Sequence, residues 1–295
     1  MKIFFCADDF GLTKSISDDI LECYDKGVIN SVGLLANGDA FGYAIKEYKK
    51  RPGIRLVTHL NIHEGYPISP PNKVDLLING EGIFFHSFQS LFISYQKSSK
   101  KTREKYREQI RREYVAQIKK VLENTSAEKE AILDSHQHFH ILPFIFDIIL
   151  EINQEIPIAY IRLPDESFKR HKFDEISFRW IIKLLKSFFM ASIIRMGKYR
   201  DKIREKGMIS SDYFYGVLFT NKKGLEDITY ALDTMKTLED KTIEFMFHPG
   251  RAKPGDEYVF MNNNDEMKFY FSEDRRGEHD ILIDPKLKDT VDKMI

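Results

Sequence analysis

Three histidines occupy alternate positions in the heptapeptide DSHQHFH, residues 134–140: His136, His138 and His140. They follow the apolar run AILD, and an alternating pattern of this kind predicts the end of a β-strand. Because residues two apart on a strand point to the same face, all three rings could project in one direction. Imidazole is a common metal ligand and the usual acid or base near neutral pH, so the cluster indicates a metal or catalytic site. The alternative is a polar strand end whose rings only bond to their neighbours.

Carboxylates and further histidines also follow apolar runs elsewhere in the chain. Asp8 and Asp9 end the run KIFFCA, where neighbouring residues point in different directions, so one could bind a metal while the other acts as a base. Aspartate before a helix is also a common N-cap, which is the structural alternative. His59 ends the run RLVTHL, and His248 lies in FHPG. Each of these histidines taken alone is more often structural, and the proline and glycine of FHPG could serve only to lead the chain out of a strand.

Short apolar runs alternate with amphipathic helical patterns, which favours a parallel sheet covered by helices. We expect strands at residues 3–7, 28–38, 55–60, 131–135, 158–164 and 242–248, and helices at 15–26, 40–50, 102–124, 143–154, 225–238 and 285–294. Polar residues recur where these strands end, at Asp8, Asp9, Asn37, His59, His136 and His248. The active sites of α/β barrels lie at that edge, and a closed ring brings all the strand ends together. The predicted fold class is therefore α/β, as a (β/α) barrel of the TIM type or a distorted or incomplete version of it.

The whole chain, residues 1–295, is expected to form a single catalytic domain. Residues 61–92 are rich in Gly, Pro and Asn and indicate a long ordered loop, and such loops are usually functional. Residues 167–211 form a long insertion rich in Phe, Lys and Ile, and we expect residues 167–199 to be largely helical. This insertion is a candidate lid over the site or a candidate surface for a homodimer.

Charge and composition argue against several classes of function. The chain has 45 Lys plus Arg and 45 Asp plus Glu, so its formal net charge is zero and no nucleic-acid partner is expected. No apolar stretch approaches the ~20 residues that span a bilayer, and the first apolar run is too short for a signal peptide, so we expect a cytoplasmic protein with no membrane partner. Glycine-rich phosphate loops are absent, which argues against a nucleotide cofactor. Cys6 and Cys23 are expected to pack as small hydrophobes without a disulfide.

The polar strand ends suit one kind of chemistry in particular. One carboxylate and two imidazoles from three strands would make a facial ligand set that leaves positions open for water and substrate. Such a site holds a divalent metal that acts as a Lewis acid or activates water. A second carboxylate could take the proton from that water, and a histidine such as His248 could donate one to the leaving group. A glycosidase is less favoured, because Asp8 and Asp9 are sequence neighbours and are awkwardly placed to span a glycosidic bond.

Six motifs occur in an order that resembles the YdjC-type carbohydrate deacetylases: ADDFG, NGDAF, THLNIHEGYP, DSHQHFH, IRLPDE and FHPG. They extend from Asp8 to Gly250, over most of the chain, and the pair ADDFG and DSHQHxH is the most specific part. The resemblance implies a barrel-like fold related to polysaccharide deacetylases. It also implies metal-dependent removal of an N-acetyl group from an amino sugar or chitooligosaccharide, in free or phosphorylated form.

The resemblance assigns roles to five positions. Asp9, His59 and His136 match the metal ligands of the family, Asp8 matches its general base, and His248 matches a histidine that acts as the acid or stabilises the oxyanion. The implied cofactor is one divalent metal ion, with Mg²⁺ favoured over Zn²⁺, Co²⁺ or Ni²⁺. Substituting His136 should then remove the metal, whereas substituting His140 should leave most of it bound.

Six further residues are expected to bind the sugar or to support the ligands: Asn37, His63, His138, His140, Arg162 and Glu166. His138 and His140 would line the sugar pocket or orient the ligands. Arg162 and Glu166 would build the pocket or hold a ligand histidine, and a structural ion pair is the alternative. His63 stands where a Thr-like residue is more usual in the family, and it would either add a ligand or line the pocket.

Three other readings stay open. A metal-dependent hydrolase or isomerase of another phosphorylated sugar would keep the ligand set but change the bond broken. A non-enzymatic sugar-binding protein would keep the pocket without turnover. A partner-binding scaffold would use residues 167–211 as its interface and leave the acidic and histidine positions without metal.

Overall fold

Seven parallel strands form one sheet in the part of the chain that the computed structural model describes, residues 1–125, 130–166, 178–218, 224–256 and 264–294. Their order across the sheet is β5-β4-β3-β2-β1-β7-β6. The strands are β1 (Lys2–Phe10), β2 (Ser31–Leu34), β3 (Arg55–Leu60), β4 (Ala131–Ser135), β5 (Ile158–Ile161), β6 (Tyr213–Tyr215) and β7 (Thr242–Phe247). Every neighbouring pair is parallel, so all the carboxyl ends lie at one edge.

The sheet curls until its two edge strands approach each other. Tyr160 of β5 forms an isolated parallel bridge with Ile209, just before β6, and Glu166 forms another with Phe214 in β6. These two bridges connect the edges without a continuous ladder. The fold is therefore an incomplete (β/α) barrel, which confirms the predicted fold class.

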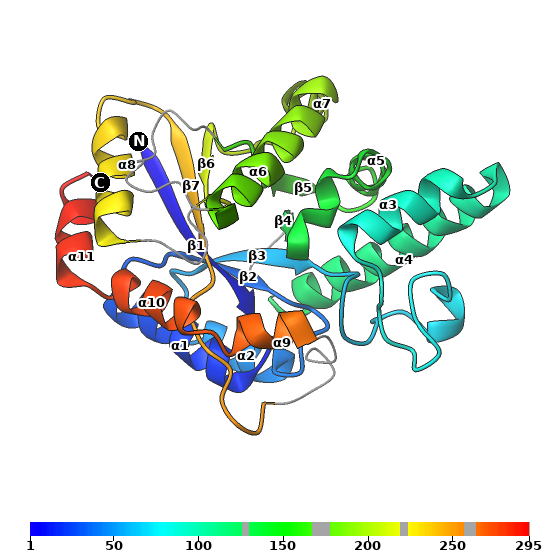
Figure 1. Ribbon diagram of the computed structural model, residues 1–295, viewed down its shortest axis with the longest axis horizontal. Helices are drawn as coiled ribbons and strands as arrows, with labels where there is room; N and C mark the ends of the chain where they lie inside the picture. Colours follow the sequence, from blue (N-terminus) through cyan, green and yellow to red (C-terminus); the bar gives the residue numbers. More distant parts are fainter. Residues whose placement is uncertain (126–129, 167–177, 219–223, 257–263, 295) are drawn as a thin grey trace.

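Helices surround the curled sheet (Figure 1). The α-helices are α1 (Lys14–Lys26), α2 (Phe41–Tyr48), α3 (Phe88–Lys97), α4 (Lys100–Asn124), α5 (Pro143–Ile152), α6 (Phe178–Met196), α7 (Tyr199–Glu205), α8 (Leu225–Met235), α9 (Asn264–Tyr270), α10 (Glu273–Leu282) and α11 (Pro285–Asp292), and two short 3₁₀ helices are η1 (Pro71–Lys73) and η2 (His136–Ile141). None of the described helices is both long and apolar enough to cross a membrane.

The first βα unit illustrates how the sequence builds these layers. Residues Ile3 to Phe10 of β1 are all buried, as expected of a central strand packed on both faces. The Thr13 hydroxyl caps α1 by accepting a hydrogen bond from the Ile16 amide, 3.2 Å away. Ile16 and Ile20 then pack into the core against the sheet. Cys6 and Cys23 are buried free thiols in this region, as predicted.

Several predicted boundaries differ from the structure. Strand β2 covers only residues 31–34 of the predicted 28–38, and the predicted helix at 167–199 is described only from residue 178 because residues 167–177 lie outside the described part. Lys198, with a φ of 51°, separates α6 from α7. Two helices that were not predicted, α9 and α10, precede the predicted C-terminal helix.

Candidate active site

Strand β4 covers the predicted residues 131–135, but the histidines follow it in a tight turn, so the expectation that their rings project from one strand face was wrong. Strand β4 stops at Ser135, and Gln137 and His138 adopt left-handed φ values of 54° and 60°. The Ser135 hydroxyl accepts a hydrogen bond from the backbone N–H of His140 at 3.0 Å, and this local bond replaces further strand pairing. The three rings therefore have different surroundings and do not share one face.

A β-bulge directs Asp8 and Asp9 to different partners. The pairing of β1 with β2 shifts register between Ala7 and Phe10, and Asp9 has a φ of 69°. The Asp9 carboxylate accepts a hydrogen bond from Arg275 of α10 at 2.8 Å through Oδ2. Although Asp9 is fully buried, which alone would raise its pKa, the charges of Arg275 and His136 hold that pKa well below its usual value. Asp9 is thus a buried anion.

Asp9, His59 and His136 converge in the way predicted for metal ligands. One ligand atom from each lies within 4.8 Å of the others. Asp9 Oδ1 lies 3.3 Å from His136 Nδ1 and 3.9 Å from His59 Nε2. This buried oxygen accepts no hydrogen bond of good geometry in the described part of the chain. An orphaned carboxylate oxygen that faces two imidazole nitrogens is an arrangement that a divalent cation would satisfy, so these residues fit the implied metal.

Each candidate ligand histidine has a carboxylate beside its other ring nitrogen. His59 Nδ1 lies 2.7 Å from Asp134 Oδ1, and His136 Nε2 lies 3.1 Å from Glu64 Oε1. These contacts leave His59 Nε2 and His136 Nδ1 directed at Asp9, as carboxylate–histidine–metal arrangements require. Burial alone would lower the pKa of both histidines, but the neighbouring carboxylates outweigh it and raise the pKa of both rings. Binding of a cation would therefore release protons.

Arg162 joins three carboxylates at the base of the site. It donates to both oxygens of Asp8, at 2.7 and 3.0 Å, and to Glu244 of β7 at 2.8 Å. It also pairs with Asp134, the partner of His59. Burial raises the pKa of Asp8, and the charge of Arg162 partly offsets that rise. Arg162 thus ties the candidate base to the residues behind the ligand set.

His248 lies at the same edge of the sheet, directly after β7. Its backbone N–H donates to Glu278 of α10 at 2.6 Å, and its ring packs edge-on against Phe269. A positive charge on this ring would help to lower the pKa of both Asp9 and His138. The fold therefore places the candidate acid at the same edge of the sheet as the candidate metal site.

His140 and His138 have separate environments. His140 Nδ1 accepts from the Ser135 hydroxyl at 2.6 Å, and Nε2 donates to the Arg162 carbonyl at 2.9 Å. Burial lowers the pKa of His140 to about 4, so the ring is neutral. His138 is buried beside Phe214, and burial lowers its pKa well below the usual value. His140 thus braces the turn that presents His136.

Asn37, His63 and Glu166 contact backbone around the site. Asn37 donates to the carbonyls of Glu64 and Tyr66, both at 3.1 Å. His63 donates through Nδ1 to the His86 carbonyl at 2.8 Å, and its ring packs against that of His136. Glu166 accepts the amides of Gly216 and Leu218, at 3.0 and 2.9 Å. These contacts order the loops that surround the ligand set.

Sequence reasoning missed several residues of this constellation: Glu64, Asp134, Glu244, Tyr270 and Arg275. Asp134 and Glu64 stand inside quoted motifs, DSHQHFH and NIHEG, so a search for carboxylates behind the ligand histidines could have found them. Arg275 has no such signal, because it reaches Asp9 across 266 positions of the chain.

Residues 2–293 match the family model described as YdjC-like protein. The chain belongs to the YdjC-like family. A relative of this YdjC-like chain, the carbohydrate deacetylase of Xenopus laevis, is 29% identical over 297 residues, which cover 96% of this chain and 91% of the relative. Carbohydrate deacetylase 1 of Listeria innocua is 31% identical over 169 residues, which cover 57% of this chain and 63% of the relative. The predicted family is thus confirmed.

A solved structure from Enterococcus faecalis V583 shares the fold of this YdjC-like chain. That protein, described as a cellobiose-phosphate cleavage protein, superposes with a TM-score of 0.70 over 99% of this chain and 94% of its own. The sequence identity is 20%, so the likeness concerns the fold.

Proposed function

We propose that this chain is a divalent-metal-dependent deacetylase that hydrolyses the acetamido group of an N-acetylated amino sugar. The observation that carries the proposal is the buried Asp9 Oδ1, which faces His136 Nδ1 at 3.3 Å and His59 Nε2 at 3.9 Å. The names of the carbohydrate deacetylase relatives support the same reaction class. When bound, the metal would supply Lewis acidity to the acetyl carbonyl and acidity to the attacking water.

The chain's own residues would supply positioning and proton transfer. Asp134 and Glu64 would fix the orientations of His59 and His136. Asp8 would accept a proton from the attacking water, because a carboxylate oxygen held by Arg162 keeps a second lone pair. Attack forms the new C–O bond, and the C–N bond breaks as His248 protonates the departing amine. The products are acetate and the free amino sugar.

The remaining residues and the metal ion would have secondary roles. His138 and His63 would line the sugar pocket, while His140, Asn37, Arg162 and Glu166 would order its walls through the contacts described above. One divalent ion would occupy the ligand set, and Mg²⁺, Zn²⁺, Co²⁺ and Ni²⁺ are the candidates. A homodimer and a cytoplasmic location also remain predictions, to be measured by light scattering and by fractionation of cells.

The decisive assay is acetate release. Purified protein would be stripped with EDTA, reloaded with each candidate ion and assayed on N-acetylglucosamine, its oligomers and their phosphorylated forms. We expect acetate only after reloading, and only one ion per chain by elemental analysis. Failure to release acetate from every such sugar with every ion would refute the proposal.

A further inference from the structure

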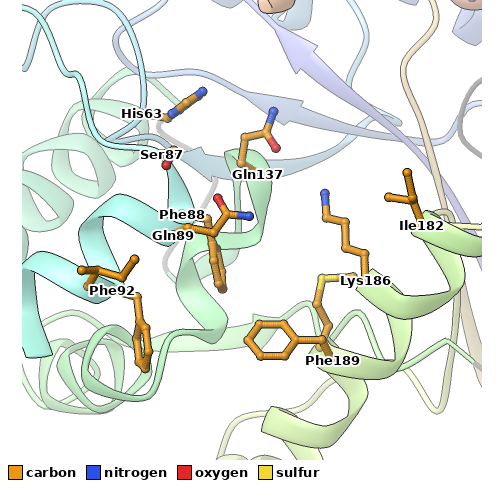
Figure 2. A pocket seen from close by; sticks show the side chains of 11 residues that line it. His63, Ser87, Phe88, Gln89, Phe92, Gln137, Ile182, Lys186 and Phe189 are labelled. Carbon is orange, nitrogen blue, oxygen red and sulfur yellow. The ribbon is translucent and has the colours of Figure 1, made fainter. Parts of the chain in front are cut away.

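A cavity of 540 Å³ opens beside the candidate active site, between α3 and α6 (Figure 2). Its apolar wall consists of Phe88, Phe92, Ile93, Ile182, Phe189 and Met190. Helix α6 belongs to the insertion at residues 167–211, which matched no sequence motif. The cavity is therefore lined mainly by α3 and α6, and neither helix contributes a candidate metal ligand.

One end of the cavity lies beside the candidate metal site, although the three candidate ligands are not among its described lining residues. His63 and Gln137 line this end, and Figure 2 shows both away from the aromatic rings of Phe92 and Phe189. Gln137 follows the ligand candidate His136 in the chain, and the ring centroid of His63 lies 5.8 Å from that of His136. A molecule whose amide reaches the ligand set could thus extend into the cavity without leaving the protein.

Lys186 of α6 marks the junction between the two ends. Figure 2 shows its side chain extending from the helix toward Gln137. The cavity is thus polar next to the candidate active site and apolar farther away.

The chemistry of the far wall disfavours a second sugar unit. Sugar hydroxyls need hydrogen-bond partners, and the polar side chains that line the cavity, Ser87 and Gln89 among them, are outnumbered by apolar ones. The wall instead presents aromatic and aliphatic side chains that are open to solvent, with Ile182 52% exposed and Phe189 54% exposed. A hydrocarbon chain would remove this apolar surface from water, and it has no polar groups that need hydrogen-bond partners. A polar head and an apolar tail match the two ends of the cavity.

We propose that the cavity binds the hydrocarbon tail of an amphipathic amino sugar, so the substrate is a glycolipid whose acetamido group lies at the ligand set. This inference rests on the proposed deacetylase function for its polar end. The tail site itself can be measured without turnover.

The first test is direct binding of the product class. Alkyl β-glycosides of glucosamine with methyl, butyl, hexyl and octyl tails carry no acetyl group, so they are not turned over. Calorimetric titration below the micelle concentration should give an affinity that rises about two- to fourfold for each added methylene until the cavity is filled. Equal affinity for all four glycosides would overturn the tail site, whatever the enzyme does.

A matched pair of variants on α6 tests where the tail binds. Phe189 lines the cavity, whereas Phe188, at a similar exposure of 50% against 54%, is not among its described lining residues. Phe189→Gln should lower the affinity for the octyl glycoside at least tenfold and leave that for the methyl glycoside unchanged. Phe188→Gln should leave both unchanged. Equal losses in the two variants would overturn the cavity proposal, since they would indicate that the glycoside adsorbs on the outside of α6.

Kinetics separate this inference from the proposed function. For the corresponding N-acetylglucosamine glycosides, kcat/KM should increase with tail length in the same steps as the affinity. If all the glycosides released acetate with the same kcat/KM, the tail site would be overturned and the deacetylase proposal would stand. No release from any glycoside, together with tail-dependent binding, would overturn the deacetylase proposal alone.

Discussion

His59 and Asp134 are register partners on the neighbouring parallel strands β3 and β4, and their side chains meet at 2.7 Å between Nδ1 and Oδ1. Sheet pairing itself therefore places a carboxylate behind a candidate ligand histidine. Because Asp134 also pairs with Arg162, and Arg162 with Asp8, this contact connects the ligand set to the candidate base.

Replacing Asp134 tests the support of the ligand histidine. Asp134→Asn keeps the shape of the side chain but removes the negative charge that orients His59. We expect metal affinity to fall by about ten- to a hundredfold, as for other partners of ligand histidines. Calorimetric titration of metal into the EDTA-treated protein measures this. Asp147→Asn, which changes an exposed carboxylate that pairs with Lys202, is the matched control and should bind metal normally.

Replacing Asp8 and Asp9 separately tests the division of roles between the two neighbours. Asp9→Asn should lose the metal, because it removes the buried anion that faces both ligand histidines. Asp8→Asn should keep the metal and lower kcat by about 10²- to 10⁴-fold, the usual size of a general-base contribution. Elemental analysis after dialysis and acetate release give the two readouts. Loss of metal from Asp8→Asn would make Asp8 a ligand and contradict this assignment.

The histidines of DSHQHFH should differ sharply on substitution. His136→Ala should abolish metal binding. His140→Ala should keep most of the metal but lower the free energy of unfolding by about 1–3 kcal/mol, because the Ser135 hydroxyl and the Arg162 carbonyl each lose a buried partner. Urea unfolding and metal titration on both variants measure these effects. Identical metal loss in the two variants would mean that the rings are equivalent.

His140 should also make stability depend on pH. Its pKa is about 4 in the folded chain against an ordinary value of 6.5, so between these values the unfolded chain binds more protons. The contribution of this group to stability is complete above pH 6.5 and is lost as the pH falls toward 4. Between pH 7.5 and pH 5.0 the loss should be about 2 kcal/mol.

Urea unfolding of the wild type and of His140→Asn at these two pH values isolates that contribution. The variant lacks the titrating ring, so its free energy of unfolding should fall less between pH 7.5 and pH 5.0. The same fall in both proteins would show that other groups carry the pH dependence.

Sequence patterns predicted the general fold and the approximate location of the site. Apolar runs are local, and parallel strands always direct their carboxyl ends to one edge, so Asp8, His59 and His248 could be expected to gather there. The motif order then supplied the candidate ligands Asp9 and His59. The register shift in β1 and the turn after Ser135 were not predicted, because each depends on which neighbour the backbone bonds to.

By itself, the sequence determined the parallel α/β class, the family and the residue types at each strand end. The family resemblance singled out His136 among the three motif histidines, but only the tertiary structure decided which acids lie behind the candidate ligands. The physical reason is separation along the chain: His59 meets Asp134 across 75 positions, and Asp9 meets Arg275 across 266. Contacts of that kind depend on how the strands pair and on where α10 packs. A local pattern of residues predicts neither of these.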